Sequence, residues 1–399
     1  MEELGGLLGR AAYFSAAFTA AFMAASLWSA RRLRRARDAA APLSAAPFRP
    51  PITILKPIKG TDPDMYRNLA SFLDQDYPRY QVLFCVQDPQ DPALPILERL
   101  RQDFGRVELD IVISTHRIGY NPKVNNLSNA YRFAQHEFLV LSDSDVRVGR
   151  TFLREAAAAF ADPELGLATC FYRATGAAGA TTALEALSVN AQFLPQALTA
   201  ALVGRMRFAM GAAMVVRRAA FEAAGGLPAL SHHLADDYLL GQAVAAAGYR
   251  VELSPLLVDS IPDRGTLRQQ FAHMVRWSRT IRVCHPAGFA GTIVLHGAVL
   301  LALHAAFGGG WRALGWAAAL ELWRAAALAW MHVAYLDNRE ILAQLPWLPA
   351  SDLAQFAAWF AGLRSGTVLW RGESYSVTTG GRLVPRRRKA QALAAASLG

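Results

Sequence analysis

A short acidic stretch, Asp143-Ser144-Asp145, is the part of the sequence best suited to chemistry. It follows an apolar run, Phe138–Leu141, that is typical of a buried strand in a parallel sheet. Open α/β sheets bind ligands just beyond the carboxyl ends of such strands. Two carboxylates this close repel each other unless a cation lies between them, and their oxygens suit Mg²⁺ or Mn²⁺ on a diphosphate. The stretch predicts a metal site at Asp143 and Asp145, with a solvated turn as the plainer alternative.

Two further groups of polar residues stand where they could serve the same site. Asp88 follows an apolar run, 82–86, and Asp236-Asp237 opens a helix that runs to Ala247. Acidic residues are favoured in a first helical turn, so ordinary helix capping is the alternative for the pair. The segment 269–282 predicts an amphipathic helix at the membrane surface, which leaves Arg276 able to bind a diphosphate.

The elements that must position these side chains alternate between strand and helix from about residue 51 to residue 260. Strands are predicted at 52–55, 82–86, 107–113 and 138–141, with helices between them. This order indicates a parallel, right-handed, doubly wound sheet. Two more strands, 165–172 and 208–216, flank an Ala-rich helical segment at 181–204. Asp88 and Asp143 would both lie at the ligand-binding edge of the sheet.

The composition indicates a membrane protein. Hydrophobic residues make up 53% of the 399 residues, and Ala11–Ala30 carries no charge. Five arginines follow that stretch at once: Arg31, Arg32, Arg34, Arg35 and Arg37. The positive-inside rule then places the N-terminus outside and everything after Arg31 in the cytoplasm, with a cleaved signal peptide as the alternative. The expected location is a bacterial-type inner membrane. The net charge of +10 is concentrated in arginine runs without interleaved aromatic residues, so a membrane surface is favoured over nucleic acid.

Two more apolar stretches, Gly288–Phe307 and Trp311–Tyr335, predict about two C-terminal spans. Glu321 and Arg324 lie three residues apart in the second, and we expect them to pair or to face protein. The predicted order is an N-terminal anchor with its basic flank (1–38), a linker (39–50), a cytoplasmic catalytic domain (51–262), an amphipathic interfacial segment (263–286), transmembrane and interfacial helices (287–363) and a cytoplasmic tail (364–399).

The order of the motifs resembles that of the ceramide glucosyltransferase family (family 21), membrane-bound inverting glycosyltransferases with the GT-A fold. The matching stretches are Val86–Pro89, Asn121–Asn126, Asp143-Ser144, Ala235–Tyr238, Met274–Trp277 and Leu369–Tyr375. Bacterial hopanoid glycosyltransferases look similar across the same motifs. The chain departs from the family in two places. His273 stands where the family commonly has Gln or Arg, and Asp145 stands where the eukaryotic ceramide enzymes have Gly.

The resemblance implies an α/β, Rossmann-like GT-A domain that binds a UDP-sugar. Asp88 would contact the uridine, and Arg276 would bind the diphosphate. Asp143 and Asp145 would hold the divalent cation, Mn²⁺ or Mg²⁺, on that diphosphate. For Lys123 there are two alternatives, a phosphate contact or a solvent-facing helix start.

On the acceptor side, the resemblance makes Asp237 the general base that takes the proton of the acceptor hydroxyl. Trp277 would lie against the sugar or the acceptor. His273 could donate a hydrogen bond to a phosphate oxygen or to an acceptor hydroxyl, with a charge that depends on pH.

The function that the resemblance implies is inverting transfer of one sugar, glucose by preference, from a UDP-sugar to the hydroxyl of a membrane lipid such as ceramide. A hopanoid (bacteriohopanetetrol) N-acetylglucosaminyltransferase is the main alternative. A polysaccharide synthase would need a pore, and about three spans are too few to line one. An inactive membrane scaffold is disfavoured because all the acidic motifs are intact.

Overall fold

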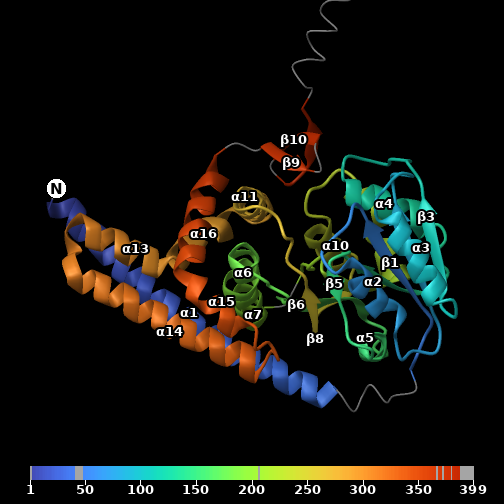
Figure 1. Ribbon diagram of the computed structural model, residues 1–399, viewed down its shortest axis with the longest axis horizontal. Coiled ribbons are helices and arrows are strands. Elements are labelled where there is room, and N and C mark those ends of the chain that lie inside the picture. The colour runs from blue at the N-terminus through green and yellow to red at the C-terminus, as the bar shows by residue number, and fades with distance from the viewer. Residues whose placement is uncertain are drawn as a thin grey trace, which may run out of the picture.

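The computed structural model describes residues 2–40, 48–204, 207–364, 367–370, 373–378 and 380–386. Most of the predicted linker 39–50, the end of the predicted tail 364–399 and two residues of the motif Leu369–Tyr375 lie outside this part of the chain. A sheet with helices on both faces forms one side of the molecule, and a bundle of long helices extends from the other side (Figure 1). The site of interest lies in the sheet domain.

An eight-stranded sheet forms the centre of the sheet domain, in the order β3-β2-β1-β4-β7-β6-β8-β5. Its first half is parallel: β1 (Ile52–Ile58) pairs with β2 (Tyr80–Val86) on one side and with β4 (Phe138–Ser142) on the other, and β2 pairs with β3 (Glu108–Ile113). All seven residues of β1 are buried. The predicted strands 52–55, 82–86, 107–113 and 138–141 are therefore confirmed.

The second half of the sheet is mixed in direction, unlike the parallel half that the alternation of strands and helices predicted. β7 (Ala213–Arg217) runs antiparallel to both β4 and β6 (Leu165–Ala174). β8 (Arg250–Ser260) is parallel to β6, and the short β5 (Val146–Arg147) is antiparallel to β8. A strand buried on both faces gives the same apolar run in either direction, so the sequence pattern does not show its orientation. The reversal brings the segment before β7 to the carboxyl end of β4.

Helices cover both faces of this sheet and divide the core in two. One cluster contains Ile54, Phe72 and Phe84, and the other contains Leu55 and Leu83. Because successive side chains of a strand point to opposite faces, Ile54 and Leu55 belong to different clusters. The helices are α2 (Met65–Leu73), α3 (Leu94–Asp103), α4 (Pro122–Tyr131), α5 (Phe152–Ala159), α8 (Arg218–Ala223), α9 (Gly226–Leu230) and α10 (Asp236–Ala246).

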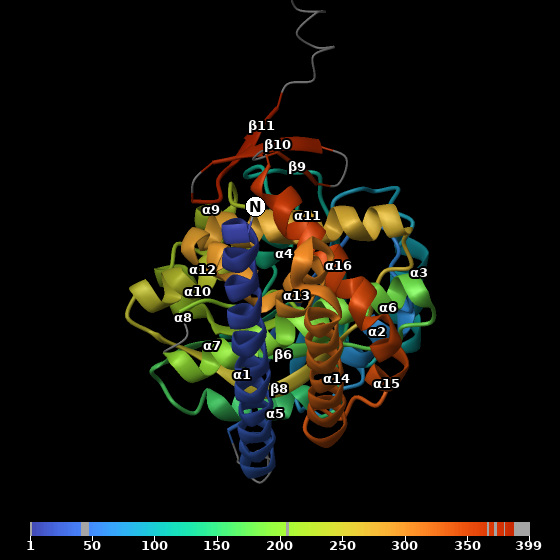
Figure 2. The ribbon, with the colours of Figure 1, turned by 90° about the vertical axis from the view of Figure 1, so that its left-hand side faces the viewer.

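The helical bundle contains α1 (Glu2–Ala40), α13 (Gly297–His304) and α14 (Gly310–Ala334). Figure 2 shows α1 and α14 side by side along most of their length. Two described helical stretches, 6–39 and 180–203, are long and apolar enough to cross a membrane. A bent pair, 286–295 with 297–334, is a third candidate. The chain is thus built as a membrane protein with one N-terminal apolar helix and further candidate spans.

The C-terminal part of the bundle differs from the prediction in one respect. The predicted span Gly288–Phe307 is a broken stretch: α12 (Pro286–Gly291), the 3-10 turn η3 (Thr292–Leu295), α13, and the π turn η4 (Ala305–Gly309). The axis bends by 57° near His296. Apolar composition alone does not reveal such a break. The predicted span Trp311–Tyr335 corresponds to the single helix α14.

A second group of helices lies between the sheet and the bundle (Figure 1). It consists of α6 (Ala180–Leu187), the π turn η2 (Ser188–Phe193), α7 (Leu194–Val203), α11 (Leu267–Cys284), α15 (Ile341–Gln344), the 3-10 turn η5 (Leu345–Trp347) and α16 (Leu348–Leu363). Arg324 of α14 is buried and contacts Glu321 at 3.4 Å, which confirms the predicted pair, and it also contacts Asp352 of α16. This buried ion pair joins α14 to α16.

Three short C-terminal strands form a separate antiparallel sheet, β9 (Thr367–Trp370), β10 (Glu373–Val377) and β11 (Leu383–Pro385). The amide of Leu383 donates to the carbonyl of His232 at 2.7 Å, and the amide of Leu234 donates to that of Gly381 at 2.9 Å. The small sheet therefore holds the loop that leads into α10 and its two aspartates.

Candidate active site

Lys123 links two of the predicted motifs. Asn121 caps α4, because its side-chain oxygen accepts from the amides of Lys123 and Val124 at 2.9 and 3.1 Å. This cap fixes Lys123 in the first turn, and its Nζ lies 2.6 Å from Oδ1 of Asp143. The lysine side chain is only 15% exposed. Lys123 therefore does not occupy a solvent-facing helix start, and its charge faces the acidic stretch after β4.

The two aspartates that open α10 approach the same point. Asp236 lies 3.8 Å from the Lys123 ammonium and accepts a hydrogen bond from Asn121 Nδ2 at 3.2 Å. Gly211 marks where the groups meet. A Cβ atom there would lie 2.9 Å from Oδ2 of Asp237, 3.3 Å from Lys123 Nζ and 3.5 Å from Oδ2 of Asp143. The missing side chain of Gly211 thus leaves a small space bordered by Asp237, Lys123 and Asp143.

The charges of this group shift one another's protonation. Burial, and then the charge of Asp236, raise the pKa of Asp237 to about 6. Burial alone would lower the pKa of Lys123, but Asp143, Asp236 and Asp237 outweigh it and hold that pKa above its usual range. A carboxylate whose pKa lies near neutral pH is suited to accept a proton. Asp237 can therefore take up a proton near neutral pH.

A buried lysine lies beneath the acidic stretch. Lys56 of β1 is fully buried, and its Nζ donates to the carbonyl of Asp143 at 2.6 Å and to Ser142 Oγ at 3.3 Å. Burial lowers the pKa of Lys56 to about 7, although Asp145, Asp143 and Asp62 act to raise it. The lysine fixes the backbone where β4 ends and the aspartates begin.

Asp145 lies next to two other carboxylates. Burial, and then the charges of Asp143 and Asp62, raise the pKa of Asp145 to about 7. Asp62 also accepts a hydrogen bond from Ser144, the residue between the two aspartates. Asp145 itself accepts a weak hydrogen bond from Ser260 at 3.4 Å. Crowded carboxylates of this kind gain most from a bound cation.

The carboxylates near the end of β4 match part of what a divalent cation needs. Within the described residues, no three His, Cys, Asp or Glu side chains are arranged to hold a metal on their own. Mg²⁺ at phosphate sites is commonly held by one or two carboxylates, with water and substrate phosphates completing its shell. Asp143 and Asp145 supply those two carboxylates, so the residues present fit such an ion together with a diphosphate.

Asp88 lies at the same edge of the sheet as Asp143 but not in the cluster. It lies two residues after the end of β2, its side chain is exposed, and it accepts a hydrogen bond from the amide of Gln90 at 2.8 Å. β1 separates β2 from β4. Strands lie ~4.8 Å apart, so the two carboxyl ends are about 10 Å apart. This spacing suits two parts of one extended ligand, such as a nucleoside and its diphosphate.

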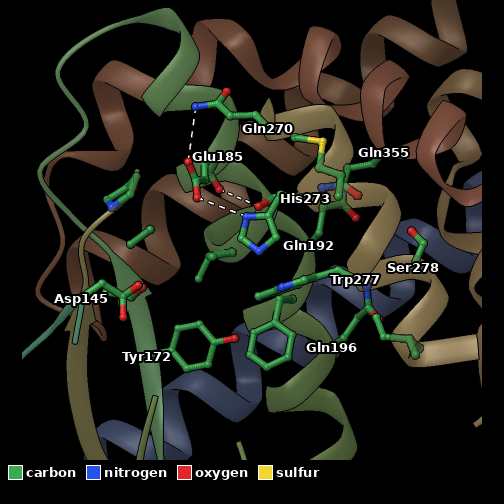
Figure 3. A pocket seen from close by; sticks show the side chains of 18 of the residues that line it. Asp145, Tyr172, Glu185, Gln192, Gln196, Gln270, His273, Trp277, Ser278 and Gln355 are labelled. Atoms are coloured by element: carbon green, nitrogen blue, oxygen red, sulfur yellow. Dashed lines mark hydrogen bonds and ion pairs between the residues drawn. The ribbon is translucent and has the colours of Figure 1, made fainter. Parts of the chain in front are cut away.

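A cavity of about 140 Å³ lies beside the acidic cluster, between α6–η2 and α11. Asp145 and Tyr172 line its sheet side, and His273 and Trp277 line it from α11 (Figure 3). Trp277 also stands against Phe193, with ring centroids 5.5 Å apart. Arg276 lies on the same helix but is not among the described residues that line this cavity. The structure therefore brings His273 and Trp277 to the cavity that Asp145 lines, while Asp88 and Arg276 are not among its described lining residues.

Three residues of this region have no counterpart among the predicted site residues: Lys56, Tyr172 and Glu185. Each lies in a stretch whose pattern predicts only a strand or a helix. Lys56 had a signal, because a lysine inside an apolar strand is rarely buried without a partner. Tyr172 and Glu185 meet the site only through the packing of α6 and β6, which the sequence does not show.

The chain belongs to glycosyl transferase family 21, whose model matches residues 11–383. It is 24% identical over 365 residues to ceramide glucosyltransferase 3 of Caenorhabditis elegans, covering 84% of this chain and 74% of that protein. It is 26% identical over 234 residues to ceramide glucosyltransferase 1 of the same organism, covering 58% of this chain and 50% of that protein. The chain thus spans about half the length of ceramide glucosyltransferase 1. A shorter match, 37% over 117 residues, is to the ceramide glucosyltransferase of Candida albicans, covering 26% of this chain and 22% of that protein.

Among solved structures, the chain is similar to a mannosyltransferase from Pyrobaculum calidifontis determined with GDP-Man and Mn²⁺. The TM-score is 0.50 at 22% identity, covering 89% of this chain and 99% of that one. This similarity shows the fold, that of the GT-A glycosyltransferases. Together with the family match, it establishes a glycosyltransferase with candidate membrane helices.

Proposed function

We propose that this chain transfers one sugar, glucose by preference, from a UDP-sugar to the hydroxyl of a ceramide-like membrane lipid, with inversion at the anomeric carbon. The observation that carries the proposal is the convergence of Asp237, Lys123 and Asp143 around Gly211, beside a cavity bordered by apolar helices. The named relatives act on ceramide, and the candidate spans give the chain access to such a lipid.

The reaction would proceed by direct displacement. The acceptor oxygen attacks the anomeric carbon, the bond from that carbon to the diphosphate oxygen breaks, and the hydroxyl proton passes to the carboxylate of Asp237. Lys123 and Arg276 would face the charge of the departing UDP. Asp88 would hold the uridine. Asp143 and Asp145 would hold a divalent cation, which when bound neutralises charge on the diphosphate.

The acceptor assay tests this proposal directly. Purified chain in nanodiscs is offered UDP-glucose, UDP-galactose or UDP-N-acetylglucosamine with a short-chain ceramide, a hopane polyol or a water-soluble glycoside. We expect β-linked transfer to a lipid, with at least ~10-fold higher kcat/KM than to the glycoside, because only the lipid reaches the site from the bilayer. Preference for the hopane polyol would identify the alternative acceptor. Faster transfer to the soluble glycoside would overturn the proposal.

We also propose that the sheet domain, residues 51–262, faces the cytoplasm of a bacterial-type cell. Arg34 and Arg37 follow the uncharged stretch Ala11–Ala30 of α1 on the side of the sheet domain, and the positive-inside rule puts such residues in the cytoplasm. Protease added to sealed cells should leave the domain intact, while the same protease cleaves it after the membrane is opened. Cleavage in sealed cells would reverse this topology.

A further inference from the structure

The cavity between α6–η2 and α11 holds a polar group that the reaction above does not use. Glu185 of α6 lies inside it with a side chain only 14% exposed. Its Oε2 accepts from Gln270 Nε2 at 3.3 Å, and its Oε1 lies 3.5 Å from His273 Nδ1 (Figure 3). An ionised carboxylate has about four acceptor positions, so these two contacts leave some of them for a further donor.

A second observation also points to a ligand that donates hydrogen bonds. Gln270 is only 5% exposed and lines the same cavity. Its Oε1 is buried and has no hydrogen-bond partner within the described part of the chain. A buried acceptor without a partner costs free energy, which a ligand donor would recover. The cavity wall is thus rich in acceptors, at Glu185 and Gln270.

The rest of the cavity suits the part of a lipid next to its headgroup. The walls carry apolar side chains, namely Val189, Phe193, Ile261, Met274 and Ile281. An apolar cavity of about 150 Å³ holds a benzene molecule, so this one has room for roughly six heavy atoms. That is enough for a headgroup and its first carbons. One wall of the cavity is formed by the stretch 180–203, which is apolar enough to contact a bilayer.

The cavity also adjoins the catalytic cluster. Asp145 is one of its lining residues, and so is Tyr172. Burial, and then the charges of Asp237, Asp143 and Asp145, raise the pKa of Tyr172 well above its usual range. A headgroup in the cavity would therefore lie next to Asp145.

We propose, resting on the proposed lipid acceptor, that this cavity binds the acceptor headgroup and that Glu185 determines its specificity. The lipid it takes carries, besides the hydroxyl that receives the sugar, a second hydrogen-bond donor, either a hydroxyl or an amide N–H. A lipid with a single hydroxyl leaves the Glu185 and Gln270 acceptors unpaired and binds less well.

The test compares two short-chain lipids on the full chain in nanodiscs. One has the reactive hydroxyl with an amide N–H and a second hydroxyl, and the other has those two further donors methylated. We expect Glu185→Gln to reduce the wild-type preference for the first lipid at least ~10-fold. The reduction should be seen both in the KM for the acceptor and in direct binding of the lipid without donor. The KM for the UDP-sugar should be unchanged. Gln270→Leu should act in the same direction. Glu252→Gln, a partly exposed glutamate on β8, is the matched control and should leave the preference unchanged.

The outcomes separate this inference from the proposed function. Transfer to both lipids with a preference that Glu185→Gln does not alter would overturn the inference alone. Preferential binding that depends on Glu185, without transfer to any lipid, would support the inference and overturn the proposed function. Absence of both lipid binding and transfer would overturn both. A polyol lipid in a third arm would show whether hydroxyl or amide N–H is the preferred second donor.

Discussion

Replacing Asp237 with asparagine should reduce sugar transfer by ~10²- to 10⁴-fold, the usual contribution of general-base catalysis, with donor binding nearly unchanged. The asparagine keeps the size of the side chain and its contact with the amide of Tyr238, now 2.8 Å from Oδ1, but it cannot accept the proton of the acceptor hydroxyl. Steady-state rates together with UDP-sugar binding by calorimetry measure the two effects separately.

The dependence of kcat/KM on pH tests the role of Asp237 as general base in a second way. Because the pKa of Asp237 is raised to about 6, kcat/KM should fall as the pH drops through about 6, where the base becomes protonated. The profile is measured with saturating donor and Mn²⁺. The exposed Asp110→Asn on β3 is the matched control and should retain both rate and profile. Near-normal turnover of the Asp237 variant would contradict its assignment as the general base and make Asp236 the next candidate.

Much of the parallel half of the sheet could be predicted, because its strands are short apolar runs that alternate with helices. That pattern was enough to expect Asp88 and Asp143 at one sheet edge. The antiparallel course of β7 was not accessible from the pattern, although it is what carries Gly211 to the end of β4. The direction in which two strands pair depends on contacts between segments distant in sequence. The repeat of apolar residues within one strand does not show that direction.

The candidate site shows the same division. The prediction selected Lys123 and Asp237 through the family motifs, and the structure places both at Gly211. It missed Lys56, whose partner is the backbone carbonyl of Asp143, and Glu185, which meets His273 only because α6 lies against α11. Backbone partners and helix–helix contacts are properties of the fold. The spacing of residues in the sequence therefore does not show which partners such residues have.

Removing divalent cations should abolish transfer, and Mn²⁺ or Mg²⁺ should restore it. Burial is the largest cause of the raised pKa of Asp145, and the charges of Asp143 and Asp62 raise it further. Without a cation, the Asp145 carboxyl therefore resists full ionisation near neutral pH. Two carboxylates hold such an ion weakly until a diphosphate completes its shell. Calorimetry should therefore show tighter UDP binding in the presence of Mn²⁺ than after treatment with EDTA.

The variant Asp145→Asn sharpens this test, because it removes one of the two proposed carboxylate ligands and leaves Lys123 and Asp143 paired at 2.6 Å. We expect it to lose both transfer and the Mn²⁺ dependence of UDP binding, whereas Asp110→Asn keeps them. EDTA already saturated with Mn²⁺ controls for effects of the chelator itself. Full activity after exhaustive chelation would contradict the prediction. The charge of the departing UDP would then have to be met by protein cations, with Lys123 the best placed of those at the cluster, since its ammonium already lies against Asp143.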